Sequence, residues 1–85
     1  MKKLLSYHAE FKKKFPGAIP IYRGDDWYFF IGDDAMTAAK VLGITVSCNS
    51  DNIQTAYFPR HALDIYLPKL IKAGLRVCIQ DEGIQ

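Results

Sequence analysis

The apolar residues of this 85-residue chain change their spacing several times, and this limits the possible folds more than any other feature. Turn-forming residues divide the chain at Pro16-Gly17, Gly24-Asp25-Asp26, Gly32-Asp33-Asp34, Gly43, Asn49 to Asn52, Pro59 and Gly74. Between these points the apolar residues recur every three or four positions, as in helices, or every second position, as in strands. The chain is therefore expected to alternate helices with strands.

Three segments have helical spacing. The first covers residues 2–15, and its apolar face is formed by Leu4, His8, Phe11 and Phe15. The second is expected to begin at Asp33 or Asp34, acting as an N-cap, and to end at Gly43. The third opens at Pro59 and ends at Gly74. Pro68 lies beyond the first turn of this helix and has no N–H to donate, so a kink is expected there.

Five segments have the alternation of strands. Residues 19–23 and 27–31 flank Gly24-Asp25-Asp26 and predict a hairpin. Residues 44–48 and 53–58 flank a polar turn, and residues 75–79 form the last strand. The order is α-β-β-α-β-β-α-β. Residues 1–85 are therefore expected to form a single α+β domain, with one mixed sheet packed against three helices.

Charge and composition exclude several classes of protein. Eleven Lys and Arg against nine Asp and Glu give a net charge of +2, which is too small to indicate nucleic acid by itself. Polar residues from Ser6 onward interrupt the apolar stretch that a signal peptide needs, and no membrane-spanning run is present. We therefore expect a cytoplasmic protein with no membrane partner.

The two cysteines should then be reduced. The strand-like surroundings of Cys48 and Cys78 predict that both are buried.

The titratable residues do not form a recognisable catalytic or metal-binding pattern. His8, His61, Cys48 and Cys78 lack the spacing of zinc ligands, and no pair of them has the spacing of a nucleophile with its base. The pair Asp33-Asp34 is explained by a helix N-cap. We therefore expect no metal, no cofactor and no enzymatic activity, and a protein that acts by binding.

Three segments carry a family resemblance that extends from about Tyr7 to Gln80. The first contains Tyr22-Arg23, a Gly-Asp pair, an aromatic pair and Asp33-Asp34-Ala35. The second contains Pro59, His61-Ala62-Leu63-Asp64, Tyr66-Leu67 and Lys69-Leu70, and the third contains Gly74, Val77, Ile79 and Gln80-Asp81-Glu82. On these residues the chain resembles the N-terminal, mismatch-recognition domain of the MutS family of DNA repair proteins. The resemblance implies a mixed sheet with three helices.

The resemblance also implies a DNA contact through a Phe-x-Glu motif, whose Phe wedges beside a mispaired base while its Glu hydrogen-bonds that base. Here the two positions hold Trp27 and Phe29. An indole can stack on a base, but Phe29 has no hydrogen-bonding group to replace the carboxylate. The phosphate-binding loop of the family's ATPase is absent from the sequence. We therefore expect a stand-alone domain that keeps only part of the mismatch-reading chemistry.

Strand alternation places Trp27 and Phe29 on one face and Tyr28 and Phe30 on the other. Trp27 is then an exposed stacking residue, part of the core, or covered by a partner, and the sequence leaves these alternatives open. The other candidate contacts are Arg23, Lys12, Lys13 and Lys14. Arg23 could instead pair with a neighbouring aspartate, and the lysines could simply be a solvated helix end.

Two functions follow from these observations. The first is a module that binds DNA, including mismatched duplex, or a DNA-associated protein. A domain with this charge is expected to bind DNA at the weak end of the non-specific range of about 10⁻⁴–10⁻⁶ M, or not at all. The alternative is a protein-interaction module that has lost DNA reading and uses Trp27 and Phe29 to bind a partner or a second copy of itself.

Overall fold

The computed structural model describes residues 2–80, which form three α-helices and five strands in the expected order. The helices are α1 (Lys2–Lys14), α2 (Asp33–Leu42) and α3 (Leu63–Lys72), and a short 3₁₀ turn at Arg60–Ala62 precedes α3. The strands are β1 (Ala18–Arg23), β2 (Trp27–Ile31), β3 (Val46–Cys48), β4 (Gln54–Pro59) and β5 (Arg76–Gln80). The predicted α+β class is confirmed.

The strands form one mixed sheet in the order β3-β4-β2-β1-β5. The pairs β3–β4, β4–β2 and β2–β1 are antiparallel, whereas β5 is parallel to β1. The predicted hairpin joins β1 to β2, and Tyr22 lies opposite Phe29 in its register. On the other side of β2, Phe29 lies opposite Tyr57 of β4. Phe29 therefore has an aromatic neighbour on both sides.

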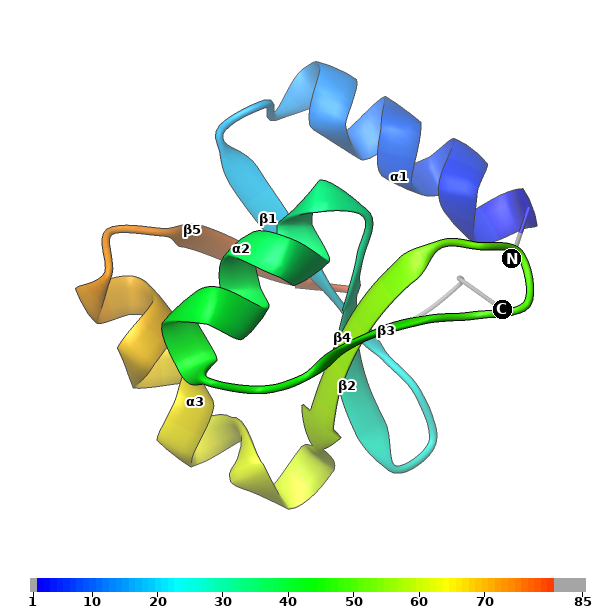
Figure 1. Cartoon of the computed structure of the whole chain (residues 1–85). Coiled ribbons are helices and arrows are strands. Elements are labelled where there is room, and N and C mark those ends of the chain that lie inside the picture. The colour runs from blue at the N-terminus through cyan, green and yellow to red at the C-terminus, as the bar shows by residue number, and fades with distance from the viewer. Residues whose placement is uncertain (1, 81–85) are drawn as a thin grey trace.

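The main core lies between one face of the sheet and helices α2 and α3. Its fully buried strand residues are Ile21, Phe30, Ala56 and Phe58, and Leu70 packs onto them from α3. Because strand residues alternate between faces, Tyr22 and Ile31 point the opposite way. They are buried with Leu4 of α1 in a second, smaller cluster. In Figure 1, α2 and α3 lie next to each other, whereas α1 crosses the upper end of the sheet.

Several local predictions are wrong. Neither Asp33 nor Asp34 caps α2: the N-cap position is Gly32, no side chain bonds there, and Asp34 is buried. Phe15 follows the last residue of α1 and is 55% exposed. Cys48 is exposed and Cys78 only partly buried. The two cysteines occupy the opposite edge strands β3 and β5, about 19 Å apart across four strand spacings, which is too far for a disulfide.

None of the helices between residues 2 and 80 has both the length and the apolar character needed to span a bilayer. Among the same residues, no group of three or more His, Cys, Asp or Glu side chains is placed to hold a metal ion.

Candidate functional site

An open hollow lined by three aromatic rings lies on the face of the sheet that α1 covers only in part. Its lining residues are Trp27 and Phe29 of β2 and Tyr57 of β4, and its volume is about 290 Å³. Trp27 is 46% exposed and Tyr57 is 48% exposed. Their ring centroids are 5.0 Å apart and the planes meet at 83°, an edge-to-face arrangement. We call this feature the aromatic hollow.

Strand register explains why the three rings meet. Trp27 and Phe29 are two positions apart in β2 and so share a face. Tyr57 lies directly opposite Phe29 in the antiparallel pair, and Pro59 lies opposite Trp27. Directly opposite side chains in such a pair have Cβ atoms about 5 Å apart, which is within reach for aromatic rings. The outward position of the Trp27 side chain excludes one alternative left open by the sequence, because the indole is not part of the core.

The floor of the aromatic hollow is held more firmly than its walls. Phe29 is partly buried, and its ring lies 5.5 Å from that of Tyr22, which is only 1% exposed. Tyr22 in turn packs with Leu4 and Ile31 beneath α1. The stacking surface of Trp27 and Tyr57 therefore stands on a floor that is continuous with the second cluster.

A short loop and an arginine border the hollow at the Trp27 end. The Gly24 N–H donates to the Trp27 carbonyl at 2.7 Å and closes the hairpin. The Arg60 N–H donates to the Asp26 carbonyl at 2.9 Å, and its guanidinium donates to the Asp25 carbonyl at 3.2 Å. The charged side chains of Arg23, Asp25, Asp26 and Arg60 are all exposed at this end. Counting only residues that the structure describes, two cations and two carboxylates make this border formally neutral.

The predicted site residues fall into two groups. Trp27, Phe29 and Arg23 lie together near the hairpin loop, and Arg23 is opposite Tyr28 in the strand register. The lysines lie elsewhere, because Lys12 contacts Ala18 at the start of β1, about 17 Å along that strand from Arg23. Lys13 and Lys14 are exposed in the last turn of α1. The lysines therefore do not line the aromatic hollow.

Lys12 belongs to a polar cluster beneath α1, and with His8 and Asp34 it lines an open hollow of about 460 Å³. Its ammonium donates to the Ala18 carbonyl at 2.8 Å and to Asp34 Oδ1 at 3.2 Å. His8 Nε2 lies 3.5 Å from Asp34 Oδ2, an electrostatic contact in which Oδ2 has no hydrogen-bond partner. His8 Nδ1 lies 2.7 Å from the Tyr22 hydroxyl. Since Asp34 can only accept, the assigned arrangement has Nε2 protonated and Nδ1 accepting from Tyr22.

Burial controls the protonation of this cluster. Burial lowers the pKa of His8, and the Lys12 charge acts in the same direction, while the Asp34 carboxylate opposes both. Burial also raises the pKa of the Tyr22 hydroxyl far above its ordinary value. The cluster joins α1 to the beginning of α2 and to β1. Its groups are directed at one another, which gives it a structural role.

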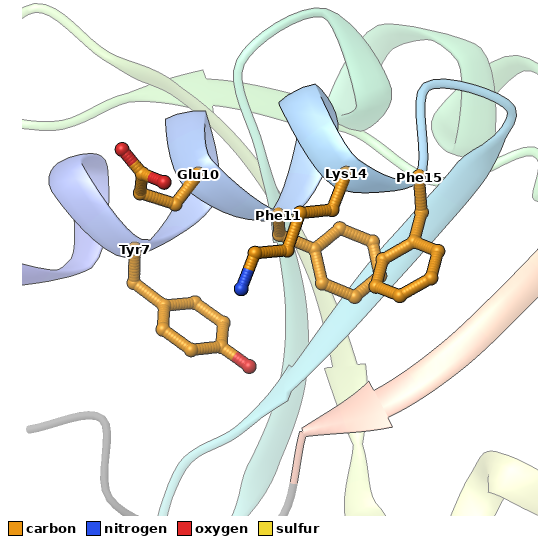
Figure 2. Close-up of a pocket in the computed structure, with 5 residues that line it drawn as sticks. All are labelled: Tyr7, Glu10, Phe11, Lys14 and Phe15. Atoms are coloured by element: carbon orange, nitrogen blue, oxygen red, sulfur yellow. The ribbon is translucent and has the colours of Figure 1, made fainter.

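A further hollow, of about 140 Å³, lies along α1 and is lined by Tyr7, Glu10, Phe11, Lys14 and Phe15. The Tyr7 ring lies 6.3 Å from that of Tyr22 in β1. Figure 2 shows the rings of Phe11 and Phe15 side by side at one end and Tyr7 at the other. The Phe11 and Phe15 centroids are 5.3 Å apart. Phe15 is thus an exposed aromatic residue outside the aromatic hollow, which makes it a suitable control in mutagenesis.

Sequence reasoning missed Tyr57. The residue lies in a segment predicted as a strand, and the buried positions Ala56 and Phe58 flank it. Alternation alone would have placed Tyr57 on the open face with Thr55. The pairing of β4 with β2, which brings Tyr57 beside Phe29, could not be predicted from local alternation.

Comparison with known proteins assigns the chain to a family. Residues 2–83 match the family model of MutS domain I. The DNA mismatch repair protein MutS of Flavobacterium psychrophilum is 45% identical over 83 residues, covering 93% of this chain and 10% of the relative. The MutS proteins of Flavobacterium johnsoniae and Porphyromonas gingivalis are 43% and 41% identical over the same length, covering 93% of this chain and 10% and 9% of the relatives.

The chain therefore spans about a tenth of the length of these curated relatives. The match includes all three helices and the whole sheet, with the aromatic hollow among the matched residues. The mixed sheet with three helices that the resemblance implies is also the arrangement found in the structure. On this evidence the chain belongs to the MutS domain I family.

Proposed function

We propose that this chain is a DNA-binding module of the mismatch-repair type that contacts DNA through the aromatic hollow. The observation that carries the proposal is the exposure of Trp27, whose indole stands on the open face of the sheet beside Tyr57. Trp27 occupies the position of the wedging Phe in the family resemblance. The names of the relatives, all DNA mismatch repair proteins, support the same ligand.

Stacking supplies most of the interaction in this proposal. A base on an aromatic side chain contributes about 1–3 kcal/mol, and this holds for every base because each has a π face. The formally neutral border adds little attraction for phosphates. Phe29 offers no hydrogen bond, so the discrimination that a carboxylate would give is absent. The proposed binding is therefore weak and depends on the indole.

The proposed role is non-catalytic. Within the described part of the chain, the aromatic hollow presents stacking surfaces and no nucleophile with an adjacent base. The His8–Asp34 contact lies under α1 and joins structural elements. Because the relatives are bacterial DNA repair proteins, we also propose that the chain meets its ligand in the cytoplasm.

The test compares Trp27→Ala with Phe15→Ala in a binding titration. Fluorescein-labelled single strands, matched duplexes and mismatched duplexes are titrated with the 85-residue chain, and anisotropy is measured. Loss of the indole should weaken binding by about 5- to 150-fold, the equivalent of 1–3 kcal/mol. Phe15→Ala, which removes an equally exposed ring outside the aromatic hollow, should leave the affinity unchanged. Absence of binding to every DNA at about 100 μM would remove DNA as the ligand.

A second candidate is a protein-interaction module, and the neutral, aromatic character of the same surface favours it. Exposed apolar patches on small proteins commonly mark interfaces. In this case the partner is a DNA-associated protein or a second copy of the chain. Sedimentation velocity tests the second copy directly: self-association that disappears with Trp27→Ala supports it, and a monomer at all concentrations rules it out.

A further inference from the structure

We propose that the aromatic hollow takes an unpaired nucleobase from single-stranded DNA, and that Tyr57 is its second stacking residue. This inference rests on the proposed function, since it specifies the form of DNA that the site accepts. It differs from the mismatch-reading role that the family resemblance implies, in which the ligand is a mispaired duplex.

The size of the hollow fits one flat ring. Its volume of about 290 Å³ lies at the lower limit of small-molecule pockets, which hold roughly 300–1,000 Å³. Its two exposed rings stand nearly perpendicular, at 83°. A base that stacks on the face of one of these rings therefore points the edge of the base at the other ring. Aromatic rings prefer this combination of stacked and edge-to-face contacts.

The polar groups of the hollow accept any base. Among residues 2–80, Phe29 forms a floor without a polar side-chain atom, and the polar side-chain groups at the hollow are the Tyr57 hydroxyl and the Trp27 indole N–H. A hydroxyl both donates and accepts, and Tyr57 is exposed enough to turn toward either kind of base edge. The site therefore suits tolerant stacking better than the reading of one particular mispair.

The charge around the hollow offers little to repay the cost of opening a duplex. A duplex hides the faces of its bases in the stack and presents phosphates, so a wedge must first separate a base step, at a cost repaid by further contacts. Here the border carries two arginines and two aspartates among the described residues, and Lys12 to Lys14 lie in the last turn of α1, where Lys12 contacts Ala18 at the far end of β1. A single strand exposes its base faces without unstacking a duplex. The aromatic hollow thus matches the ligand whose bases are already free.

The experiment uses the fact that Trp27 is the only tryptophan in the chain. A thymine oligonucleotide of about 12 nucleotides, within the usual site sizes of single-strand binders, is compared with matched and mismatched duplexes of the same length. Indole quenching reports the contact, and anisotropy of labelled DNA reports affinity. The single strand should bind at least about tenfold more tightly than either duplex, because it avoids the cost of unstacking.

Variants test the individual residues. Tyr57→Ala should weaken single-strand binding by about 5- to 150-fold, while Tyr57→Phe should retain most of the affinity because it keeps the ring. Phe15→Ala serves as the exposed-aromatic control and should bind as the unaltered chain does. Phe29→Glu should lower single-strand affinity, since it places a carboxylate at the floor of the hollow and repels phosphates. Thermal unfolding of each variant checks that it is folded.

The outcomes separate the two proposals. If a mismatched duplex binds as tightly as the single strand, the preference for unpaired bases is wrong, and the DNA-binding function stands. If Tyr57→Ala and Tyr57→Phe both bind as the unaltered chain does, Tyr57 is not a stacking residue. If neither single strand nor duplex quenches Trp27 or changes anisotropy, the proposed function itself fails.

Discussion

Asp34 and Lys12 form an ion pair that ties α1 to the beginning of α2. The ammonium lies 3.2 Å from Asp34 Oδ1, and the aspartate side chain is only 12% exposed. Removing one partner of such a pair leaves the other charge poorly solvated, which is more destabilising than losing an exposed pair. The placement of α1 over the sheet therefore depends strongly on this one carboxylate.

Asp34→Asn should lower the free energy of unfolding by about 2 kcal/mol, because Lys12 then has no charged partner. Asp33→Asn is the matched control, since Asp33 is exposed in the same helical turn and should lose only about 0.3–1 kcal/mol of helix-dipole interaction. Urea unfolding of the three proteins measures the difference. Equal losses for the two variants would show that the buried ion pair is not important.

His8 makes the stability of the fold depend on pH. Burial lowers its pKa from the ordinary value of 6.5, so the unfolded chain binds a proton more readily than the folded chain. The contribution of neutral His8 is fully present above about pH 6.5 and is lost as the pH falls through the lowered pKa of the folded state. Asp34, Lys12 and Tyr22 are the groups that face it.

The free energy of unfolding should therefore decrease as the pH falls from about 7.5 to about 5.5. Urea midpoints across this range measure the change. His8→Gln should flatten the dependence, whereas His61→Gln should leave it as it is, because His61 is exposed. A dependence that persists unchanged in His8→Gln would assign it to other groups.

At the scale of the elements, strand alternation and turn residues were sufficient to predict the hairpin and the shared face of Trp27 and Phe29. These features depend on neighbours within about ten residues. The position of Tyr57 beside Phe29 depends on β4 joining β2, and the two strands are separated by α2 and β3. The role of Asp34 likewise depends on α1, which is distant in sequence. Local patterns cannot encode such contacts, so the site was only half predictable.

Gly43 ends α2, as the sequence predicted, and its backbone conformation shows why glycine is found there. Gly43 lies at the C-cap with φ of 72°, and its N–H donates to the Ala39 carbonyl at 2.8 Å. A side chain at this position meets no atom within 4 Å, so only the left-handed backbone conformation opposes substitution. Glycine is therefore needed here for its conformational freedom and not for space.

Gly43→Ala should destabilise the fold by about 1 kcal/mol, because alanine is strained in the left-handed region. Gly17→Ala is the control: its Cβ also meets nothing within 4 Å, and Gly17 does not have a positive φ. That substitution should be neutral or stabilise slightly by restricting the unfolded chain. Thermal unfolding of both variants gives the comparison, and a similar loss in both would contradict the conformational explanation.

At the scale of the whole molecule, the helices and strands of residues 2–80 leave one end of one sheet face open. Helices α2 and α3 cover the opposite face, and α1 with its polar cluster covers the end near Ala18. The β1–β2 loop lies at the other, lower end of the sheet in Figure 1. The open end is where the aromatic hollow lies, and the charges nearest to it balance.

This balance predicts a weak dependence of DNA affinity on salt. If Arg23 and Arg60 are the cations that meet phosphates, at most two counterion-releasing contacts form, and the single-strand slope of log K against log salt is no steeper than about −1.4. Between 50 and 200 mM salt the affinity should then fall by about sevenfold at most. A protein that binds through 6–10 phosphates would lose about 10³–10⁵ over the same range. Anisotropy titrations at several salt concentrations distinguish these two modes of binding, with the double variant Lys13→Ala/Lys14→Ala as control.

The slope of log K against log salt should be unchanged in this double variant, because these lysines lie at the end of α1, away from the hollow. A steep slope that becomes shallow in the variant would instead place the DNA along α1 and not over the aromatic hollow.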